Sequence, residues 1–213
     1  MQTTVPSEGL GIKPRFEFRS FGQGFEIPAK RMARLSMPVP ENIWERQSDE
    51  IYIVSRNNDI NNTKIRDGMM DIKTLVQTLD GLEQWNPVMK GQFPLTAQIL
   101  LTEVFPAFGA ALPELTKQAY SFDDFMELVR RHQDLQAVRV HKRRFAYLVN
   151  NTICETGQVL INGARVETIS SESTETADVH KTLKDLGLEG LENINYLQAI
   201  KRVIGMIDQP LAN

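Results

Sequence analysis

The segment Arg15-Phe16-Glu17-Phe18-Arg19 alternates charged and aromatic side chains, and this alternation decides the fold. In a β-strand, residues i and i+2 point to the same face, so the three charged side chains share one face and the two phenylalanines share the other. The same alternation recurs in Lys64-x-Arg66, Asp71-x-Lys73, Lys142-x-Arg144 and Arg165-x-Glu167. The sequence therefore predicts a sheet with one apolar face and one face rich in cations, which indicates a site for an anion.

The composition excludes several classes of protein. The chain has 213 residues, 41% of them hydrophobic and 24% charged, which allows a packed core and argues against wholesale disorder. A formal net charge of −3 argues against nucleic acid as a general partner. The single cysteine, Cys154, excludes an internal disulfide and fits a reducing compartment. We find neither a signal peptide nor a membrane-length apolar run, so we expect a cytoplasmic protein without a membrane partner.

Short strands and helices follow one another in blocks. Alternating or β-branched stretches predict strands at 15–21, 50–55, 63–66, 70–78, 85–93, 137–149, 152–161 and 165–170, with hairpin turns at Asp67-Gly68 and Asn162-Gly163. Apolar or amphipathic stretches predict helices at 28–36, 95–105, 121–133, 176–186 and 191–204. Pro106 should end the second helix, and Ser121 with Asp124 forms a loose capping box for the third. Residues 1–14 should form a loose lead-in to a single domain at 15–213.

This order of elements predicts an α+β fold. Charged faces on so many strands are explained if the sheet closes, because a barrel places one face of every strand inside. We therefore expect an antiparallel β-barrel, or tunnel, with helices packed outside. A barrel with a polar interior holds a ligand.

In their order along the chain, these segments resemble the CYTH superfamily, the triphosphate tunnel metalloenzymes, which include adenylate cyclases and thiamine triphosphatases. That family opens with a Glu-x-Glu-x-Lys strand, to which residues 15–19 are similar, followed by a strand with a tyrosine, similar to Ile51-Tyr52-Ile53. Its next two strands resemble residues 64–66 and 71–73. Its second half resembles Lys142-Arg143-Arg144 and the glutamate-bearing segment 166–168.

The carboxylate motifs of the family are less complete here than the basic ones. Arg15 stands in place of the first glutamate and Arg19 in place of the lysine. The acidic residue after the tyrosine strand is absent, and the Arg-x-Glu-x-Glu strand is not evident at 85–93. Of the Glu-x-Glu in the second half only Glu167 remains, since Ile169 follows it and Glu172 is out of step.

The resemblance implies a divalent-metal-dependent hydrolase or cyclase acting on a triphosphate or polyphosphate small molecule. It assigns catalytic roles to Lys73 and Glu167, and an Mg²⁺ or Mn²⁺ site to Glu17, Glu155 and Glu167. Arginine forks and lysine ammonium groups suit phosphate oxygens. The implied phosphate-binding residues are Arg15, Arg19, Lys64, Arg66, Lys73, Lys142, Arg144 and Arg165.

Each assignment has an alternative in the sequence. Arg15, Glu17 and Arg19 fit an exposed sheet face with cross-strand ion pairs. Lys64 and Arg66 flank a turn, where they would be solvated. Arg143 competes with its neighbours Lys142 and Arg144 for the polar face, and Glu155 next to the Thr156-Gly157 turn fits a surface position.

The sequence is also compatible with two other functions. One is a polyphosphate- or nucleotide-binding module that has lost its metal-binding carboxylates. The other is an α+β interaction protein whose charges are ordinary outer faces. A homodimer is also left open.

Overall fold

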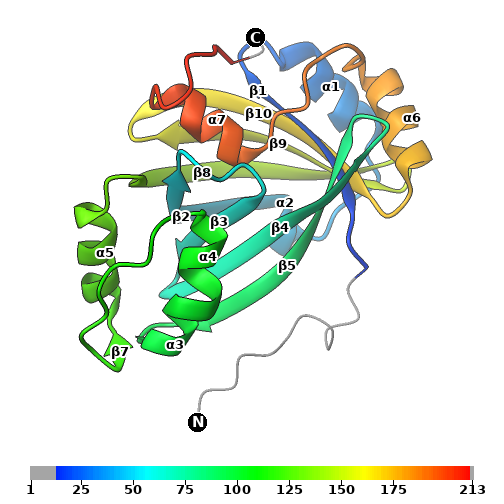
Figure 1. Cartoon of the computed structure of the whole chain (residues 1–213). Coiled ribbons are helices and arrows are strands. Elements are labelled where there is room, and N and C mark those ends of the chain that lie inside the picture. The colour runs from blue at the N-terminus through cyan, green and yellow to red at the C-terminus, as the bar shows by residue number, and fades with distance from the viewer. Residues whose placement is uncertain (1–12, 212–213) are drawn as a thin grey trace. The chain divides into compact units, whose positions relative to one another are not determined.

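The computed structural model describes residues 13–211, so the expected lead-in at 1–14 lies almost entirely outside the described residues. The strands of the barrel are β1 (Phe16–Gly22), β2 (Glu45–Ser55), β3 (Asn61–Arg66), β4 (Met69–Leu79), β5 (Leu82–Gln92), β8 (Leu135–Val149), β9 (Thr152–Ile161) and β10 (Ala164–Ser173). These eight strands of the described chain close into an antiparallel barrel in the order β1-β10-β9-β8-β2-β3-β4-β5 (Figure 1). The predicted α+β barrel with helices outside is confirmed.

Two compact units make up the described chain. Unit 1 contains Glu50–Thr74 and Asn86–Arg139, and unit 2 contains Lys13–Asp49, Leu75–Trp85 and the residues from Val140 on. The expectation of a single domain at 15–213 stays a prediction.

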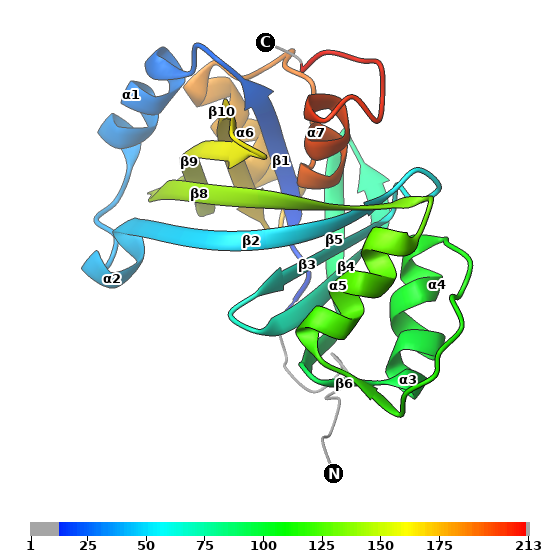
Figure 2. The same ribbon diagram turned by 90° about the vertical axis from the view of Figure 1, so that its left-hand side faces the viewer.

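In unit 2, helices cover the apolar face of β1, β9 and β10. The helices of this unit are α1 (Glu26–Leu35), α2 (Glu41–Trp44), α6 (Thr176–Leu186) and α7 (Tyr196–Val203). Helix α6 packs on all three strands and on α1 (Figure 2). Phe16 and Phe18 are buried in the core beneath α1 and α6, together with Val179 and Leu186. Because Phe16 and Phe18 face this core, Arg15, Glu17 and Arg19 lie on the opposite, polar face of β1.

In unit 1, a second core forms between β3, β4 and a helical block. Ile65 and Ile72 pack there with Phe105, Phe108 and Phe125. The block contains β6 (Leu95–Thr96), α3 (Ala97–Ile99), a π-helical turn (Leu100–Val104), α4 (Phe105–Phe108), β7 (Ala119–Tyr120) and α5 (Phe122–Arg131). The capping box of Ser121 and Asp124 is present at the start of α5.

Two predicted helix boundaries are wrong. Pro106 does not end the second helix, because it lies in the first turn of α4, where no backbone donor is required, and the helix ends at Gly109 with a left-handed φ of 60°. The last helix begins at Tyr196 instead of residue 191. Asn195 caps it by accepting a hydrogen bond from the backbone of Gln198, and the preceding Ile194 is buried in non-helical chain.

No helix within residues 13–211 has both the length and the apolar character needed to cross a membrane.

The core of unit 2 leads to a stability prediction. Leu186→Ala should lower the free energy of unfolding by about 2–5 kcal/mol, because Leu186 is 0% exposed and its truncation leaves a cavity under α6. Leu160→Ala is the matched control, since Leu160 is 39% exposed and its loss should cost under about 1 kcal/mol. Urea denaturation measures both variants. Equal losses in the two would contradict this account of the core.

Candidate anion-binding site

The polar face of unit 2 brings together groups from four neighbouring strands. The backbone register places Arg19 of β1 opposite Ser170 of β10, Ser170 opposite Glu155 of β9, and Glu155 opposite Ala146 of β8. Side chains that face each other across strands lie close enough to interact. The register alone therefore brings Arg19 and Glu155 to the same part of the face.

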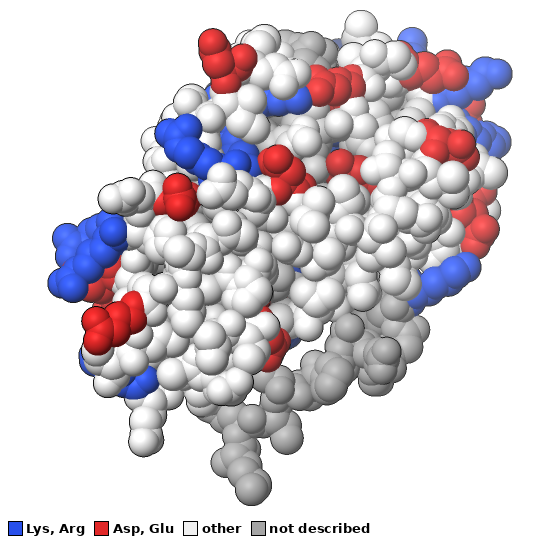
Figure 3. Space-filling view, in the orientation of Figure 1, with Lys and Arg blue, Asp and Glu red and all other residues white. Residues whose placement is uncertain are grey.

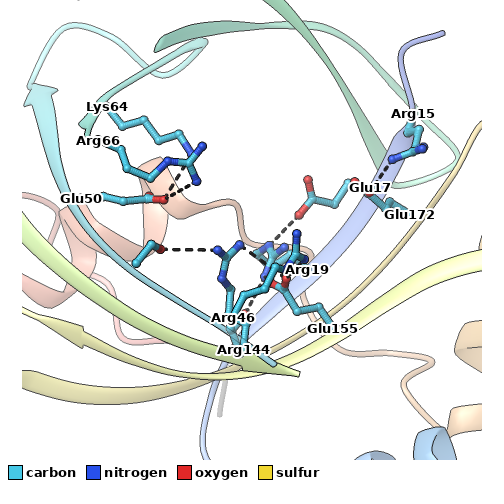
Figure 4. Close-up of polar contacts among 12 residues, drawn as sticks. Arg15, Glu17, Arg19, Arg46, Glu50, Lys64, Arg66, Arg144, Glu155 and Glu172 are labelled. Carbon is cyan, nitrogen blue, oxygen red and sulfur yellow. Dashed lines mark hydrogen bonds and ion pairs between the residues drawn. The ribbon is translucent and has the colours of Figure 1, made fainter. Parts of the chain in front are cut away.

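Three arginines from three strands converge on Glu155, and we call these four residues the arginine cluster (Figure 4). The Glu155 carboxylate lies 3.1 Å from Arg46 Nη2, 3.5 Å from Arg144 Nη1 and 3.6 Å from Arg19 Nη1. Glu155 is only 7% exposed, so it does not occupy the surface position that the Thr156-Gly157 turn suggested. One buried carboxylate thus faces three positive charges.

Arg19 is the most constrained member of the arginine cluster. Its Nε donates to Glu17 Oε1 at 2.6 Å and its Nη1 donates to Thr168 Oγ1 at 3.2 Å. Burial is the largest single cause and by itself lowers the pKa of the Arg19 guanidinium. The attractions of Glu17, Tyr196 and Glu155 and the hydrogen bond to Glu17 together outweigh it, so the pKa ends above its usual value. Arg19 therefore stays charged at every pH at which the protein is folded.

Neighbouring residues on β8 separate onto opposite faces. Lys142 is buried at 2% exposed, with its ammonium 3.7 Å from the ring centroid of Tyr196, and Arg144 joins the arginine cluster. Arg143 points the other way, where its Nε donates to Glu45 at 2.7 Å. Lys142 and Arg144 therefore share the polar face, and Arg143 does not.

A row of three glutamates crosses β5, β1 and β10 in the same unit. Glu17 lies opposite Glu83 on one side and opposite Glu172 on the other. Arg15 donates to Glu172 at 2.9 Å, and the side chains of Asn195 and Trp85 donate to Glu83. We call Glu83, Glu17 and Glu172 the glutamate row.

Burial, together with like charge, disfavours ionisation of Glu83 and Glu172 in this row. Burial is the main cause that raises the pKa of Glu83 and of Glu172, and the nearby Glu17 charge adds to it in both cases. Among the described residues, no group of three or more histidine, cysteine or acidic side chains is arranged to hold a metal ion.

The structure does not bring Glu167 and Arg165 to this polar face. Thr168 contacts Arg19, so residues of even number on β10 face the arginine cluster and those of odd number face the helices. Glu167 lines a surface cavity of about 200 Å³ beside Phe25 and Glu26 of the α1 region, and Arg165 is exposed. The even-numbered Glu172, which appeared out of step in the sequence, is the β10 carboxylate on the polar face.

Unit 1 has its own charged group around Glu50. The Glu50 side chain is 0% exposed and lies 3.4 Å from both Lys64 Nζ and Arg66 Nη1. Burial is the largest cause that lowers the pKa of Lys64, and the attraction of Glu50 opposes it. Lys73 is exposed on β4, and its charge also lowers the pKa of Lys64.

The sequence did not point to several residues that the structure adds to the polar face. Arg46 was missed because β2 begins at Glu45, five residues before the β-branched stretch that marks it. Asn193 and Asn195 come from a segment expected to be helical. Asn193 Oδ1 accepts from the Arg19 backbone at 2.9 Å, and its Nδ2 donates to the Glu17 carbonyl at 3.2 Å.

Elsewhere, charges of both signs are interspersed on the face of the molecule shown in Figure 3. Among the described residues visible in this view, the basic side chains form no continuous surface.

Comparisons with known proteins support the fold. No protein-family model and no curated protein sequence matches the chain. A conserved hypothetical protein from Pyrococcus furiosus superposes with a TM-score of 0.51 over 86% of this chain and 98% of that chain, at 13% identity. A Hippeastrum protein provisionally assigned as an adenylyl cyclase, and described as having a dominant triphosphatase activity, superposes with a TM-score of 0.50 at 11% identity, covering 89% of this chain and 96% of that one.

The chain shares its closed β-barrel fold with these two proteins. This confirms, at the level of the fold, the resemblance that the order of the charged strands indicated. The closed barrel explains why the polar faces of the strands carry so many charges, since a closed sheet gives every strand an inner face.

The glutamate row leads to a prediction of pH dependence. The Glu83 carboxyl loses its proton near the ordinary value of 4.5 in the unfolded chain and at a higher pH in the folded chain. Between these two values the folded state binds more protons, so its stability falls as the pH rises. Glu83→Gln should remove this fall and gain stability relative to the wild type as the pH increases from about 4.5 toward neutrality.

Urea denaturation at a series of pH values measures this difference. Glu189→Gln is the control, because Glu189 is exposed beyond α6. A constant difference in stability between wild type and Glu83→Gln at all pH values would refute the assignment.

Proposed function

We propose that the polar face of unit 2 binds the phosphate groups of a triphosphate-containing small molecule, and that the protein is a divalent-metal-dependent hydrolase of such compounds. The observation that carries the proposal is the arginine cluster, in which Arg19, Arg46 and Arg144 converge on the buried Glu155. Two opposite unit charges about 4 Å apart attract by roughly 4 kcal/mol at an intermediate dielectric. Three guanidinium groups in one place therefore form a strong binding site for condensed phosphate.

The chemistry of the donors also favours phosphate over other anions. Guanidinium groups offer paired donors that match two oxygens of one phosphate, and the Lys142 ammonium adds a point charge on the same face. Arg144 Nε is buried without a hydrogen-bond partner among the described residues, so an anion would supply a missing acceptor. The shared fold with a protein described as a triphosphatase supports the same class of substrate.

The carboxylates of the glutamate row are donors of the type that a divalent cation takes, although the three are not arranged as a complete ligand set. Mg²⁺ binds one or two carboxylates together with phosphate oxygens and water. Burial is the main cause that raises the pKa of Glu83 and Glu172, and the Glu17 charge adds to it, so a cation placed beside them would favour their ionised forms. Glu17 and Glu172 would hold Mg²⁺ or Mn²⁺, which would neutralise phosphate charge there. Glu155 is a weaker candidate ligand because three arginines already occupy its oxygens.

We also propose that Lys64 and Arg66 in unit 1 bind phosphate. Both contact the buried Glu50, and both lie on the face of β3 opposite the core residue Ile65. The exposed Lys73 is the remaining cation that the family resemblance assigns in this unit. A hydrolase directs water at the phosphorus, whereas a cyclase directs a ribose hydroxyl, so product analysis distinguishes the two reactions.

Charge reversal on β8 tests the phosphate-binding proposal. Arg144→Glu should weaken tripolyphosphate binding roughly 30-fold or more, because it removes one charge-assisted contact and adds a repulsive charge. Arg143→Glu is the matched control: the charge change is the same on the adjacent residue, but the side chain lies on the opposite face. Isothermal titration calorimetry measures both variants. Equal affinity in the two variants would remove the arginine cluster from phosphate binding.

Metal dependence provides the second test. Phosphate release from tripolyphosphate, ATP or thiamine triphosphate should require Mg²⁺ or Mn²⁺ and should stop on addition of EDTA. Glu17→Gln should lower kcat by at least about 10-fold with a smaller effect on tripolyphosphate affinity, since it removes a metal ligand and leaves the arginine cluster. Glu167→Gln, assayed in parallel, decides the assignment made from the sequence: lost turnover supports it, and unchanged turnover removes Glu167.

A second candidate function is phosphate binding without catalysis. It is favoured by the absence, within residues 13–211, of a carboxylate group arranged to hold a metal ion. A binding module would be stabilised by polyphosphate with little need for metal and would release no phosphate. Folded protein that gains thermal stability from tripolyphosphate yet hydrolyses none of the three compounds would favour this function over the hydrolase.

A further inference from the structure

The first residue of α7 contacts two of the cations on the polar face of unit 2. Lys142 Nζ lies 3.7 Å from the ring centroid of Tyr196, and the central guanidinium carbon of Arg19 lies 4.9 Å from the same centroid. The ring of Phe21 meets Tyr196 edge to face, with the centroids 4.8 Å apart and the planes at 80°. One aromatic ring thus contacts an ammonium and a guanidinium while a second ring supports it.

The backbone before Tyr196 is held in place by the same strands. Asn195 caps α7 and donates from its side chain to Glu83 at 3.0 Å. Asn193 bonds to the backbone of β1, and the Ile194 N–H donates to the Arg19 carbonyl at 2.6 Å. The position of the Tyr196 ring is therefore determined by β1 and β5 as well as by α7.

A ring in this position has a definite electrostatic effect. The face of an aromatic ring carries negative charge density and attracts cations, most strongly where water is excluded. Lys142 is 2% exposed, so the exclusion of water applies to it. Arg19 and Lys142 repel each other, and the shared ring offsets part of this repulsion before any anion is bound.

We propose that Tyr196 is a positioning residue for phosphate binding, which holds Lys142 and Arg19 on the polar face through the negative charge density of its ring. The inference rests on the proposed function and deepens it, because it adds a group that acts through the cations without touching the phosphate. The hydroxyl has no part in this role. The strength of phosphate binding should therefore follow the electron density of the ring and not its shape.

A graded series of substitutions at position 196 tests the inference. Phenylalanine and its mono- and trifluorinated analogues, incorporated at residue 196, keep nearly the same volume while the negative charge density of the ring falls with each fluorine. Tyr196→Phe should bind tripolyphosphate within about 2-fold of the wild type. The trifluorinated ring should bind it about 3- to 30-fold more weakly, with the monofluorinated ring between them. The same series at Tyr147, which faces the helix-covered core, is the control and should leave the affinity unchanged.

A second measurement needs no phosphate. In NMR spectra of the free protein, the ε-methylene protons of Lys142 should be shifted upfield by the Tyr196 ring, and Tyr196→Leu should abolish the shift while Tyr196→Phe retains it. Absence of the shift in the wild type would overturn the contact itself. If the wild type binds tripolyphosphate and all the fluorinated variants bind it with the same affinity, the positioning role is overturned and the proposed function stays intact. A shifted Lys142 in a wild-type protein that binds no tripolyphosphate would overturn the proposed function, and the positioning role with it.

Discussion

The pairing of buried cations with buried carboxylates is the constraint on which the rest of this structure depends. A guanidinium or ammonium group removed from water costs several kcal/mol unless an opposite charge and hydrogen bonds compensate it. In unit 2, Glu155 meets this need for Arg19 and Arg144 and also contacts the exposed Arg46. In unit 1, Glu50 meets it for Lys64 and also contacts the partly exposed Arg66. Each unit therefore holds cations in place around one buried carboxylate.

A glycine on β9 leaves space beside the arginine cluster. Gly157 of β9 lies opposite Arg144 on one side and Thr168 on the other. A Cβ atom at residue 157 would come within 3.2 Å of Arg144 Cγ and 3.3 Å of the Thr168 methyl, so a larger side chain would force the arginine to shift. The absence of a side chain at Gly157 thus leaves room for the long side chain of Arg144.

The alternation of charged and apolar residues correctly predicted which face of a strand each side chain lies on, wherever the strand has no bulge. It separated Arg15, Glu17 and Arg19 from Phe16 and Phe18, and the structure places the two sets on opposite faces. On β10 the same rule selects Glu172, because the strand runs without a bulge from Thr168 to Glu172. The sequence-based choice of Glu167 followed its pairing with Arg165, and nothing in the local sequence says which face of β10 the helices cover.

What the sequence determined by itself is the arrangement of alternating charged strands into an α+β barrel, since a period of two residues follows from the geometry of a single strand. What only the tertiary structure decided is which charges meet. Arg46 and Glu155 are 109 residues apart, and Asn195 and Glu83 are 112 apart, so strand order and register alone bring them together. The start of α7 also depends on tertiary contacts that the sequence does not reveal. Apolar residues at helical spacing continue before Asn195. However, hydrogen bonds from Asn193, Ile194 and Asn195 to β1 and β5 hold that segment in a non-helical conformation.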